Sequence, residues 1–409
     1  MKIILKASFI LFSLSVFSLL AEDKVLHIYQ DADLSSHSES SIAIQKGIEV
    51  AFNEIDSQIN GYRIEFKYLN HRGNVIRSKM NYQKFLEDPN ALAIYSGIHS
   101  PPLIKNRAFI NENKALTLVP WAAGGPITRY PSTENWIFRL SVDDTKAGAV
   151  IIDFAMNNQQ CQKPHLLLEE TPWGNSNLKS MSEALKKYSL DTIKVTRFSW
   201  NLKNKGARIV LDTIKQKGSD CIILVSNAVE GAVIANEMLK LPKSERLAII
   251  SHWGITGGNF HEVIDVDKRK DLELHFIQSC FAFTNEHQSQ LAQNVFAQLV
   301  KNAKGEILKP NDLKSAVGFI HAYDLTKLLI QAIKQTKITG DITIDRNAVR
   351  LALENLTSPI IGLIKTYNKP FSVFDEKHNV NAHEALGKEN YCMGRFGIND
   401  EILIFQRKK

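Results

Sequence analysis

The feature that most constrains this chain is a repeated alternation of short apolar runs with longer amphipathic stretches. VLHIY at residues 25–29 precedes a helical pattern over 44–56, and RIEFKYL at 63–69 precedes a second over 75–88. Strands that alternate with helices predict an α/β architecture built on parallel sheets. Because the apolar runs are nearly continuous, we expect helices to cover both faces of each sheet.

The alternation continues and then restarts, which predicts two lobes. Further strands are expected at 91–97, 115–120, 165–170, 192–198, 221–226 and 247–251. The two runs of strand–helix units cover roughly 24–140 and 145–280, and the amphipathic helices expected over 285–303 and 312–335 follow them. No segment rich in Pro, Ser and Gly separates the lobes, so we expect short strand-like crossovers between them.

The N-terminus has the features of a secretory signal peptide over residues 1–21. Lys2 and Lys6 begin it, an apolar run over 7–21 follows, and Glu22 and Asp23 come directly after. The run is short for a membrane span, so an uncleaved anchor is the weaker alternative. No Cys lies near the cleavage point. We therefore expect a protein exported to the periplasm.

The charge balance bears on the partners of the chain. Lys and Arg number 50 and Asp and Glu 43 among 409 residues, a net of +7 without a long basic run. A nucleic-acid-binding protein usually concentrates positive charge in a stripe. We therefore expect no nucleic-acid partner. A chain of this length favours two domains, with one large domain as the alternative.

The four cysteines are even in number, and export would place them in an oxidising compartment. Cys161 and Cys221 each come just before an apolar run, so they would lie side by side if those runs form neighbouring parallel strands. We expect the disulfides Cys161–Cys221 and Cys280–Cys392, the alternative being four buried free thiols. No CxxC spacing occurs, so neither a metal site nor a redox site is expected from the cysteines.

A binding cleft is predicted where the strands end, because open α/β sheets bind ligands at the carboxyl ends of their strands. Three of the five tryptophans, Trp121, Trp173 and Trp253, fall in such loops, each with Gly close behind. Aromatic walls, approachable backbone amides and a few hydroxyls are typical of a small-molecule cleft. The alternative is that each Trp only covers its own sheet.

Catalytic motifs do not emerge from the sequence. No G-x-S-x-G, G-x-x-x-x-G-K-[ST] or H-E-x-x-H motif occurs, so we expect no enzyme, no catalytic residue, no metal and no cofactor. Glu169 and Glu170 are expected at the rim of the cleft or paired with a Lys, acid/base catalysis being the weaker alternative. Asp143 or Asp144 is expected at the start of a helix. A secreted hydrolase, the alternative enzyme class, lacks a nucleophile–base–acid set. A purely structural envelope protein would not need the Trp-Gly loops.

An ordered set of segments resembles a known family. KGIEVAFNEID, YSGIHSPP, LVPWAAGG, FRLSVDDTKAG and AVGFIHAYDLTKLL occur in the order and spacing of the type I periplasmic binding proteins, in the leucine/isoleucine/valine-binding branch. That family consists of extracytoplasmic solute receptors of ABC transporters. The resemblance extends over nearly the whole chain after the predicted signal peptide.

The resemblance implies two lobes joined by three crossovers, near 140–142, 278–283 and 359–363. Lobe 1 would comprise 22–141 plus 284–359, and lobe 2 would comprise 142–283 plus 360–409. A small molecule is trapped between them by hinge closure, in a monomer. The membrane partner would be an ABC permease or, alternatively, a sensor kinase or chemoreceptor that uses the same fold.

The resemblance also assigns roles to cleft residues. The Ser100 hydroxyl would bind a ligand carboxylate, the amides of Ala122 and Ala123 would help, Trp173 would cover the ligand, and Asn227 would add a contact. The complete predicted ligand-binding set is His99, Ser100, Trp121, Ala122, Ala123, Trp173, Asn227 and Trp253.

Two departures from the family pattern bear on the ligand. Amino-acid binders of the family have a hydroxyl where this chain has Ala123, and an acid that holds the ligand ammonium where it has Trp253. A buried ammonium without a carboxylate is strongly disfavoured. We therefore expect an amide, a small carboxylic acid or an aromatic compound, unless Glu170, Glu230 or Asp31 supplies the missing charge.

Overall fold

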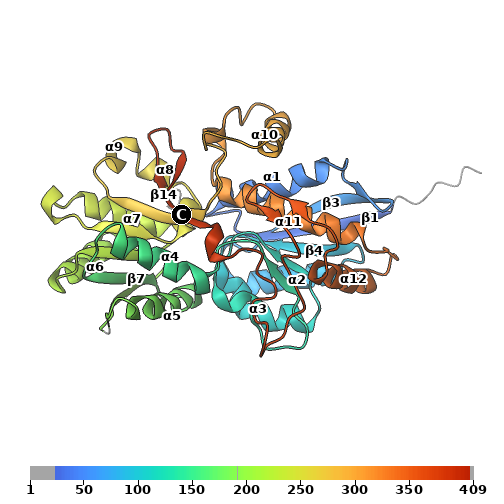
Figure 1. Cartoon of the computed structure of the whole chain (residues 1–409), viewed down its shortest axis with the longest axis horizontal. Helices are drawn as coiled ribbons and strands as arrows, with labels where there is room; N and C mark the ends of the chain where they lie inside the picture. The colour runs from blue at the N-terminus through green and yellow to red at the C-terminus, as the bar shows by residue number, and fades with distance from the viewer. Residues whose placement is uncertain (1–23, 191, 406–409) are drawn as a thin grey trace, which may run out of the picture.

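The molecule consists of two α/β lobes that lie side by side (Figure 1). The computed structural model describes residues 24–190 and 192–405, so the predicted signal peptide lies outside the described residues. Each lobe is built on one large, mainly parallel sheet with helices on both of its faces, and the α/β architecture expected from the sequence is confirmed.

The first sheet has six strands in the order β2-β3-β1-β4-β5-β6. All neighbouring pairs are parallel except the short β2–β3 hairpin. Its strands are β1 (Val25–Ala32), β2 (Gln58–Ile59), β3 (Tyr62–Asn70), β4 (Ala91–Ser96), β5 (Thr117–Val119) and β6 (Ile137–Arg139).

Helices cover both faces of this sheet because successive strand residues point to opposite sides. On β1, Ile28 belongs to the core formed with α1 (Ser38–Asn53) and α11 (Ala316–Lys334), whereas Tyr29 belongs to the core formed with α2 and α3. The other helices of this lobe are α2 (Val75–Glu87), α3 (Ser100–Glu112), α10 (Gln290–Asn302) and α12 (Ile342–Glu354). None of the helices in the described residues combines the length and hydrophobicity that a membrane crossing requires.

The second sheet has seven strands in the order β15-β14-β11-β10-β9-β7-β8. Strands β7 to β11 are parallel, and β14 and β15 extend the sheet in antiparallel fashion. The strands are β7 (Pro164–Glu169), β8 (Lys194–Phe198), β9 (Cys221–Val225), β10 (Ala248–Ser251), β11 (Leu274–Ser279), β14 (Tyr391–Phe396) and β15 (Ile402–Phe405). Its helices are α4 (Asp144–Asn157), α5 (Pro172–Lys186), α6 (Asn204–Gln216), α7 (Ala228–Leu239), α8 (Phe260–Val263) and α9 (Val266–Arg269).

Both predicted disulfides are confirmed. Cys161 bonds to Cys221, with Cα atoms 5.9 Å apart, where the neighbouring parallel strands β7 and β9 begin. Cys280 bonds to Cys392, with Cα atoms 5.0 Å apart, and joins the end of β11 to its antiparallel neighbour β14. The described part of the chain contains no free cysteine. Both bonds lie within the second lobe.

The segment predicted as the third crossover, 359–363, packs against a helix of the first lobe. The hairpin of β12 (Ile360–Ile361) and β13 (Thr366–Tyr367) is held to α11, since the Asp324 carboxylate accepts hydrogen bonds from Leu363 N (2.6 Å) and the Tyr367 hydroxyl (2.7 Å). The chain then runs beside β6, where the ring of His383 stacks on Phe138 with centroids 3.8 Å apart. Residues in this stretch, which the sequence placed in lobe 2, therefore pack on the first sheet. The exact limits of the lobes stay a prediction.

Helices α1 and α11 approach each other closely at Gly47. A Cβ atom at this position would lie 2.4 Å from the backbone oxygen of Phe319. Backbone cannot swing aside as a flexible side chain can, so α1 and α11 can keep their present separation only with glycine at this position.

We predict that Gly47→Ala lowers the free energy of unfolding by roughly 1–2 kcal/mol, because overpacking outweighs the gain in helix propensity. The matched control is Gly206→Ala in α6, where the new Cβ would meet only the end of the Leu202 side chain, at 3.0 Å. The control should be neutral or stabilising. Urea unfolding followed by circular dichroism measures both, and equal effects would contradict the packing argument.

Candidate functional site

The loops at the carboxyl ends of both sheets meet around one small cavity between the lobes. Its volume is about 10 Å³, which is room for about one water molecule. It is lined by Ile98, His99, Ser100, Pro101, Trp121, Ala123, Trp173, Asn227, Trp253 and Gly254. Seven of the eight residues predicted to bind a ligand are in this lining. The eighth, Ala122, is buried in the core beneath α3 instead. Whether these residues bind a ligand stays a prediction.

The first lobe contributes Ser100 and the loop that follows β5. The backbone N–H of Gly124 donates to Ser100 Oγ at 3.0 Å, so the first residue of α3 is tied to that loop. The buried Arg139 side chain donates to the carbonyl oxygens of Gly124 (2.9 Å) and Ala122 (3.3 Å). Ser100 and the loop are therefore held in place from the side of the first sheet.

The three loop tryptophans line the cavity from both lobes. The ring centroids of Trp121, from the first lobe, and Trp253, from the second, are 5.4 Å apart. Trp173, near the start of α5, donates through its indole nitrogen to Asp144 Oδ1 at 3.2 Å. All three rings are buried, so they fill the space where the lobes meet.

Glu169 lies at the end of β7, buried below the cavity. Its carboxyl accepts hydrogen bonds from Trp200 Nε1 (2.9 Å), from the Asn227 backbone N–H (3.0 Å) and from the Asn227 amide (3.1 Å). Burial raises the pKa of Glu169 to about 7, although these hydrogen bonds oppose the shift. The sequence placed Glu169 at the rim of the cleft. In the structure it orients Asn227, while its neighbour Glu170 is exposed.

The acids proposed to hold a ligand ammonium lie outside the cavity lining. Asp31 accepts hydrogen bonds from Ser78 (2.6 Å) and Asn81 (2.7 Å) inside the first lobe, and Glu230 accepts from the backbone of Asn201 at 2.9 Å. Burial raises the pKa of Asp31 to about 7. Within the described residues, the cavity lining therefore contains no carboxylate.

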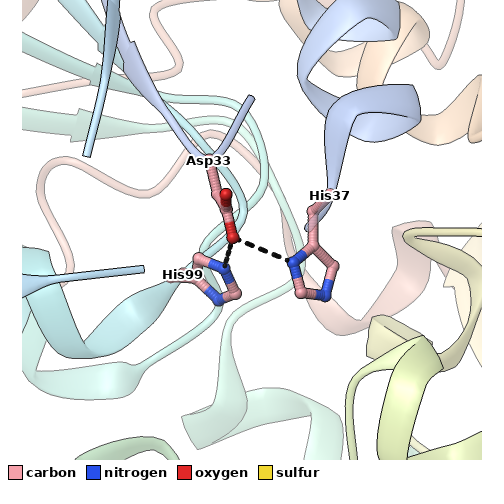
Figure 2. A group of neighbouring side chains, drawn as sticks. All are labelled: Asp33, His37 and His99. Atoms are coloured by element: carbon pink, nitrogen blue, oxygen red, sulfur yellow. Dashed lines mark hydrogen bonds and ion pairs between the residues drawn. The ribbon is translucent and has the colours of Figure 1, made fainter. Parts of the chain in front are cut away.

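A cluster that the sequence reasoning missed lies beside the cavity. Asp33 follows β1, and its Oδ2 atom lies 3.2 Å from both His37 Nδ1 and His99 Nε2 (Figure 2). Burial acts to raise the pKa of Asp33, but its hydrogen bonds to the two imidazoles and to the backbone hold it well below its ordinary value. Burial lowers the pKa of nearby His71 to about 3. The segment DADLSSH, close behind the predicted strand at 25–29, could have indicated Asp33 and His37 as site residues.

A buried ionic network joins the lobes near the first crossover. Arg139 pairs with Glu384 (Nη2–Oε1, 2.7 Å) and with Asp143 (Nη2–Oδ1, 2.9 Å), and Arg129 pairs with Asp143 at 2.6 Å. Asp143 also accepts from Thr145 N as the N-cap of α4, as the sequence predicted. Burial acts to raise the pKa of Asp143, but the two guanidinium groups hold it well below its usual range.

The sequence profile of the periplasmic binding protein family matches residues 32–240, more than half of the chain. The chain belongs to this family. No curated protein matches it by sequence.

Solved structures show the same fold over nearly the whole chain. A type 1 periplasmic binding protein from Bordetella pertussis aligns with a TM-score of 0.76 at 16% identity, covering 93% of this chain and 100% of that one. A leucine-binding protein from Thermotoga maritima gives 0.73 at 16% identity, with 93% and 98% covered. An ABC-transporter solute-binding protein from R. palustris, solved with 4-hydroxybenzoate, gives 0.75 at 15% identity, with 94% and 96% covered. The expected type I fold is therefore confirmed.

The raised pKa of Glu169 predicts a pH dependence of stability. Between about pH 4.5 and pH 7 the folded state holds this proton and the unfolded state releases it, so the free energy of unfolding falls as the pH rises. Glu169→Gln removes this contribution. Between pH 5 and pH 8, the free energy of unfolding of this variant should fall by about 1–3 kcal/mol less than that of the wild type.

Urea unfolding at the two pH values measures the difference. Glu170→Gln, at the exposed neighbouring position, is the control and should show the wild-type decrease. An unchanged decrease in Glu169→Gln would contradict the assignment of the buried proton to Glu169.

Proposed function

We propose that this chain is an exported solute-binding protein that takes up a small organic molecule between its lobes and delivers it to an ABC permease without converting it. The observation that carries the proposal is the convergence of five strand-end loops, from both sheets, on one cavity lined with three tryptophans. Membership of the periplasmic binding protein family supports the same function.

The chemistry of the cavity supports an acid or amide with an aromatic or apolar body as the solute. Ser100 supplies a hydroxyl at the start of α3, and a helix N-terminus favours negative charge. Trp121, Trp173 and Trp253 supply flat apolar surface. An α-amino acid would bring an ammonium group, and the described lining offers it no carboxylate. The R. palustris relative was solved with 4-hydroxybenzoate, which has a carboxylate on an aromatic ring.

Solute entry requires the lobes to separate, because a cavity of about 10 Å³ holds no organic molecule. Separation would move Trp121 away from Trp253, whose rings now lie 5.4 Å apart. Indole emission depends on the packing and hydration of the ring. Intrinsic fluorescence therefore provides a direct readout of lobe movement in this protein.

We predict that benzoate, 4-hydroxybenzoate or an aliphatic carboxylate raises the melting temperature and changes the tryptophan emission, whereas leucine does neither. Ser100→Ala should weaken the best acid about 10- to 100-fold, the loss expected for a hydrogen bond to a charged group. Calorimetric titration measures the affinity. Ser358→Ala, at an exposed position, is the control and should bind as the wild type does.

Two results would count against this assignment. Binding of leucine in preference to the acids would show that a carboxylate outside the described lining reaches the ligand. A library of amino acids, amides and acids that produces no shift at all would overturn the solute-binding function.

A further inference from the structure

Three potential metal ligands converge at the carboxyl edge of the first sheet. Asp33 directly follows β1, His37 is the N-cap residue of α1, and His99 is the N-cap residue of α3 after β4. Strands β1 and β4 are parallel neighbours, so the segments that leave them emerge side by side at one edge. Figure 2 shows both imidazole rings directed at the same carboxylate oxygen of Asp33.

The distances within this cluster suit a metal ion. His37 Nδ1 and His99 Nε2 each lie 3.2 Å from Asp33 Oδ2, and the three donor atoms lie within 4.8 Å of one another. Tetrahedral zinc, with Zn–N and Zn–O bonds near 2.0–2.2 Å, separates its ligand atoms by about 3.4 Å. The two imidazole rings are perpendicular, with centroids 4.6 Å apart, so they do not block each other's approach to a common point. Small side-chain movements would bring all three donors onto one ion.

The charge of the cluster also favours a metal ion. The Asp33 side chain is 3% exposed, and within the described residues it pairs with neither Lys nor Arg. By contrast, the buried carboxylates of Asp143 and Glu384 both pair with Arg139. The other oxygen of Asp33 accepts the backbone N–H groups of Ser35 and Ser36, each at 3.0 Å, which fixes the orientation of the carboxylate. Ligating carboxylates are commonly held by such outer hydrogen bonds.

We propose that Asp33, His37 and His99 form a binding site for one divalent transition-metal ion, with Zn²⁺ as the ion that fits the donor set. Imidazole is a borderline ligand and carboxylate a hard one, and zinc and its neighbours in the first transition row accept both. Three protein ligands leave a fourth position for water or another oxygen donor. The cysteine spacing and sequence motifs gave no indication of such a site, because its ligands come from two different strand-end loops.

The site lies at one end of the cleft between the lobes. His99 also lines the central cavity, and the ring of Trp200 from the second lobe lies 5.4 Å from the His99 ring. Gly258, also from the second lobe, faces His37, with 3.9 Å between its ideal Cβ position and His37 Cδ2. The second lobe thus covers the cluster, and separation of the lobes gives an ion access. A carboxylate solute that completes the coordination would follow only if the proposed function holds.

The test uses the protein purified without a polyhistidine tag and stripped of metal by a chelator. Zn²⁺ is titrated in competition with a chromophoric chelator. We expect the wild type to bind one Zn²⁺, and His37→Gln and His99→Gln each to weaken binding at least about tenfold. His378→Gln is the matched control, because His378 Nδ1 also lies beside a carboxylate, 3.1 Å from Asp375 Oδ2, but at an exposed position without a second imidazole. It should bind as the wild type does.

A second measurement on the unaltered protein avoids dependence on the folding of the variants. Co²⁺ replaces Zn²⁺, and its visible absorption together with anomalous diffraction reports coordination geometry and position. A tetrahedral spectrum and an anomalous peak among the three side chains would support the site. Absence of saturable Zn²⁺ binding, wild-type affinity in both His variants, or a Co²⁺ peak elsewhere would overturn it.

The same preparation separates this proposal from the proposed function. Acid binding by the metal-free protein together with no Zn²⁺ binding would overturn the metal site and leave the solute-binding function in place. Zn²⁺ binding that depends on His37 and His99, together with no response to any organic solute, would support the metal site and overturn the binding of an organic solute.

Discussion

The arrangement of the two lobes depends on the ion pairs and hydrogen bonds that the buried Arg139 guanidinium makes. It pairs with Glu384 from the C-terminal segment and with Asp143 at the start of α4, and it donates to the carbonyl oxygens of Ala122 and Gly124. One side chain therefore links the end of the first sheet, the first crossover, the last segment to return to the second lobe, and a loop of the cavity. Removing one member of such a buried set leaves the others charged and unpaired, which costs about 3–5 kcal/mol.

Two buried carboxyls that bond to residues of the cavity lining have pKa values shifted in opposite directions. Glu169, on the second lobe, is surrounded by the neutral donors of Trp200 and Asn227, and burial raises its pKa to about 7. Asp33, on the first lobe, faces two imidazoles and two backbone N–H groups, and its pKa is held below its ordinary value. Below pH 7 Glu169 is therefore mainly protonated, whereas Asp33 stays ionised. The ionised Asp33 carboxylate favours a cation, while the neighbouring Ser100 at the start of α3 remains available to an acid.

Sequence patterns predicted the repeated strand–helix units and the features that neighbouring residues or neighbouring strands determine. The strand–helix alternation, an N-cap at Asp143 or Asp144 and the disulfide Cys161–Cys221 follow from apolar periodicity, helix-start chemistry and the pairing of neighbouring strands. Cys280–Cys392 was the pair that remained. The packing of the stretch before β14 on β6 was not predicted, because that stretch contains no regular element and its attachment comes from His383 and Glu384, which contact residues about 245 positions earlier. No local pattern encodes such a contact.

The candidate site likewise contains residues that sequence patterns predicted and residues that they did not. Loops that follow strands could be located from the strands alone, which is why Ser100, Trp121 and Trp253 were predicted to lie together. Asp33 and His37 come from a loop that offered no aromatic residue or glycine, and the meaning of each depends on His99, which belongs to another strand-end loop. Trp200 follows the predicted strand at 192–198, but no Gly comes close behind it, and its place in the cleft depends on contacts with Glu169 and His99.

Contacts between the lobes stabilise the closed cleft, and a bound solute would have to replace them. An aromatic pair such as Trp121 and Trp253 contributes about 0.5–1.5 kcal/mol beyond the burial of its surface. A flat solute inserted between the two indoles would exchange that one contact for two, which favours aromatic over aliphatic acids. Arg139 and Asp143 lie beside the first crossover, where little displacement accompanies hinge rotation, so their ion pair can persist while the loop tips separate. Under the proposed hinge rotation, the greatest separation is expected at the strand-end loops, where Ser100, the tryptophans and the Asp33 cluster lie.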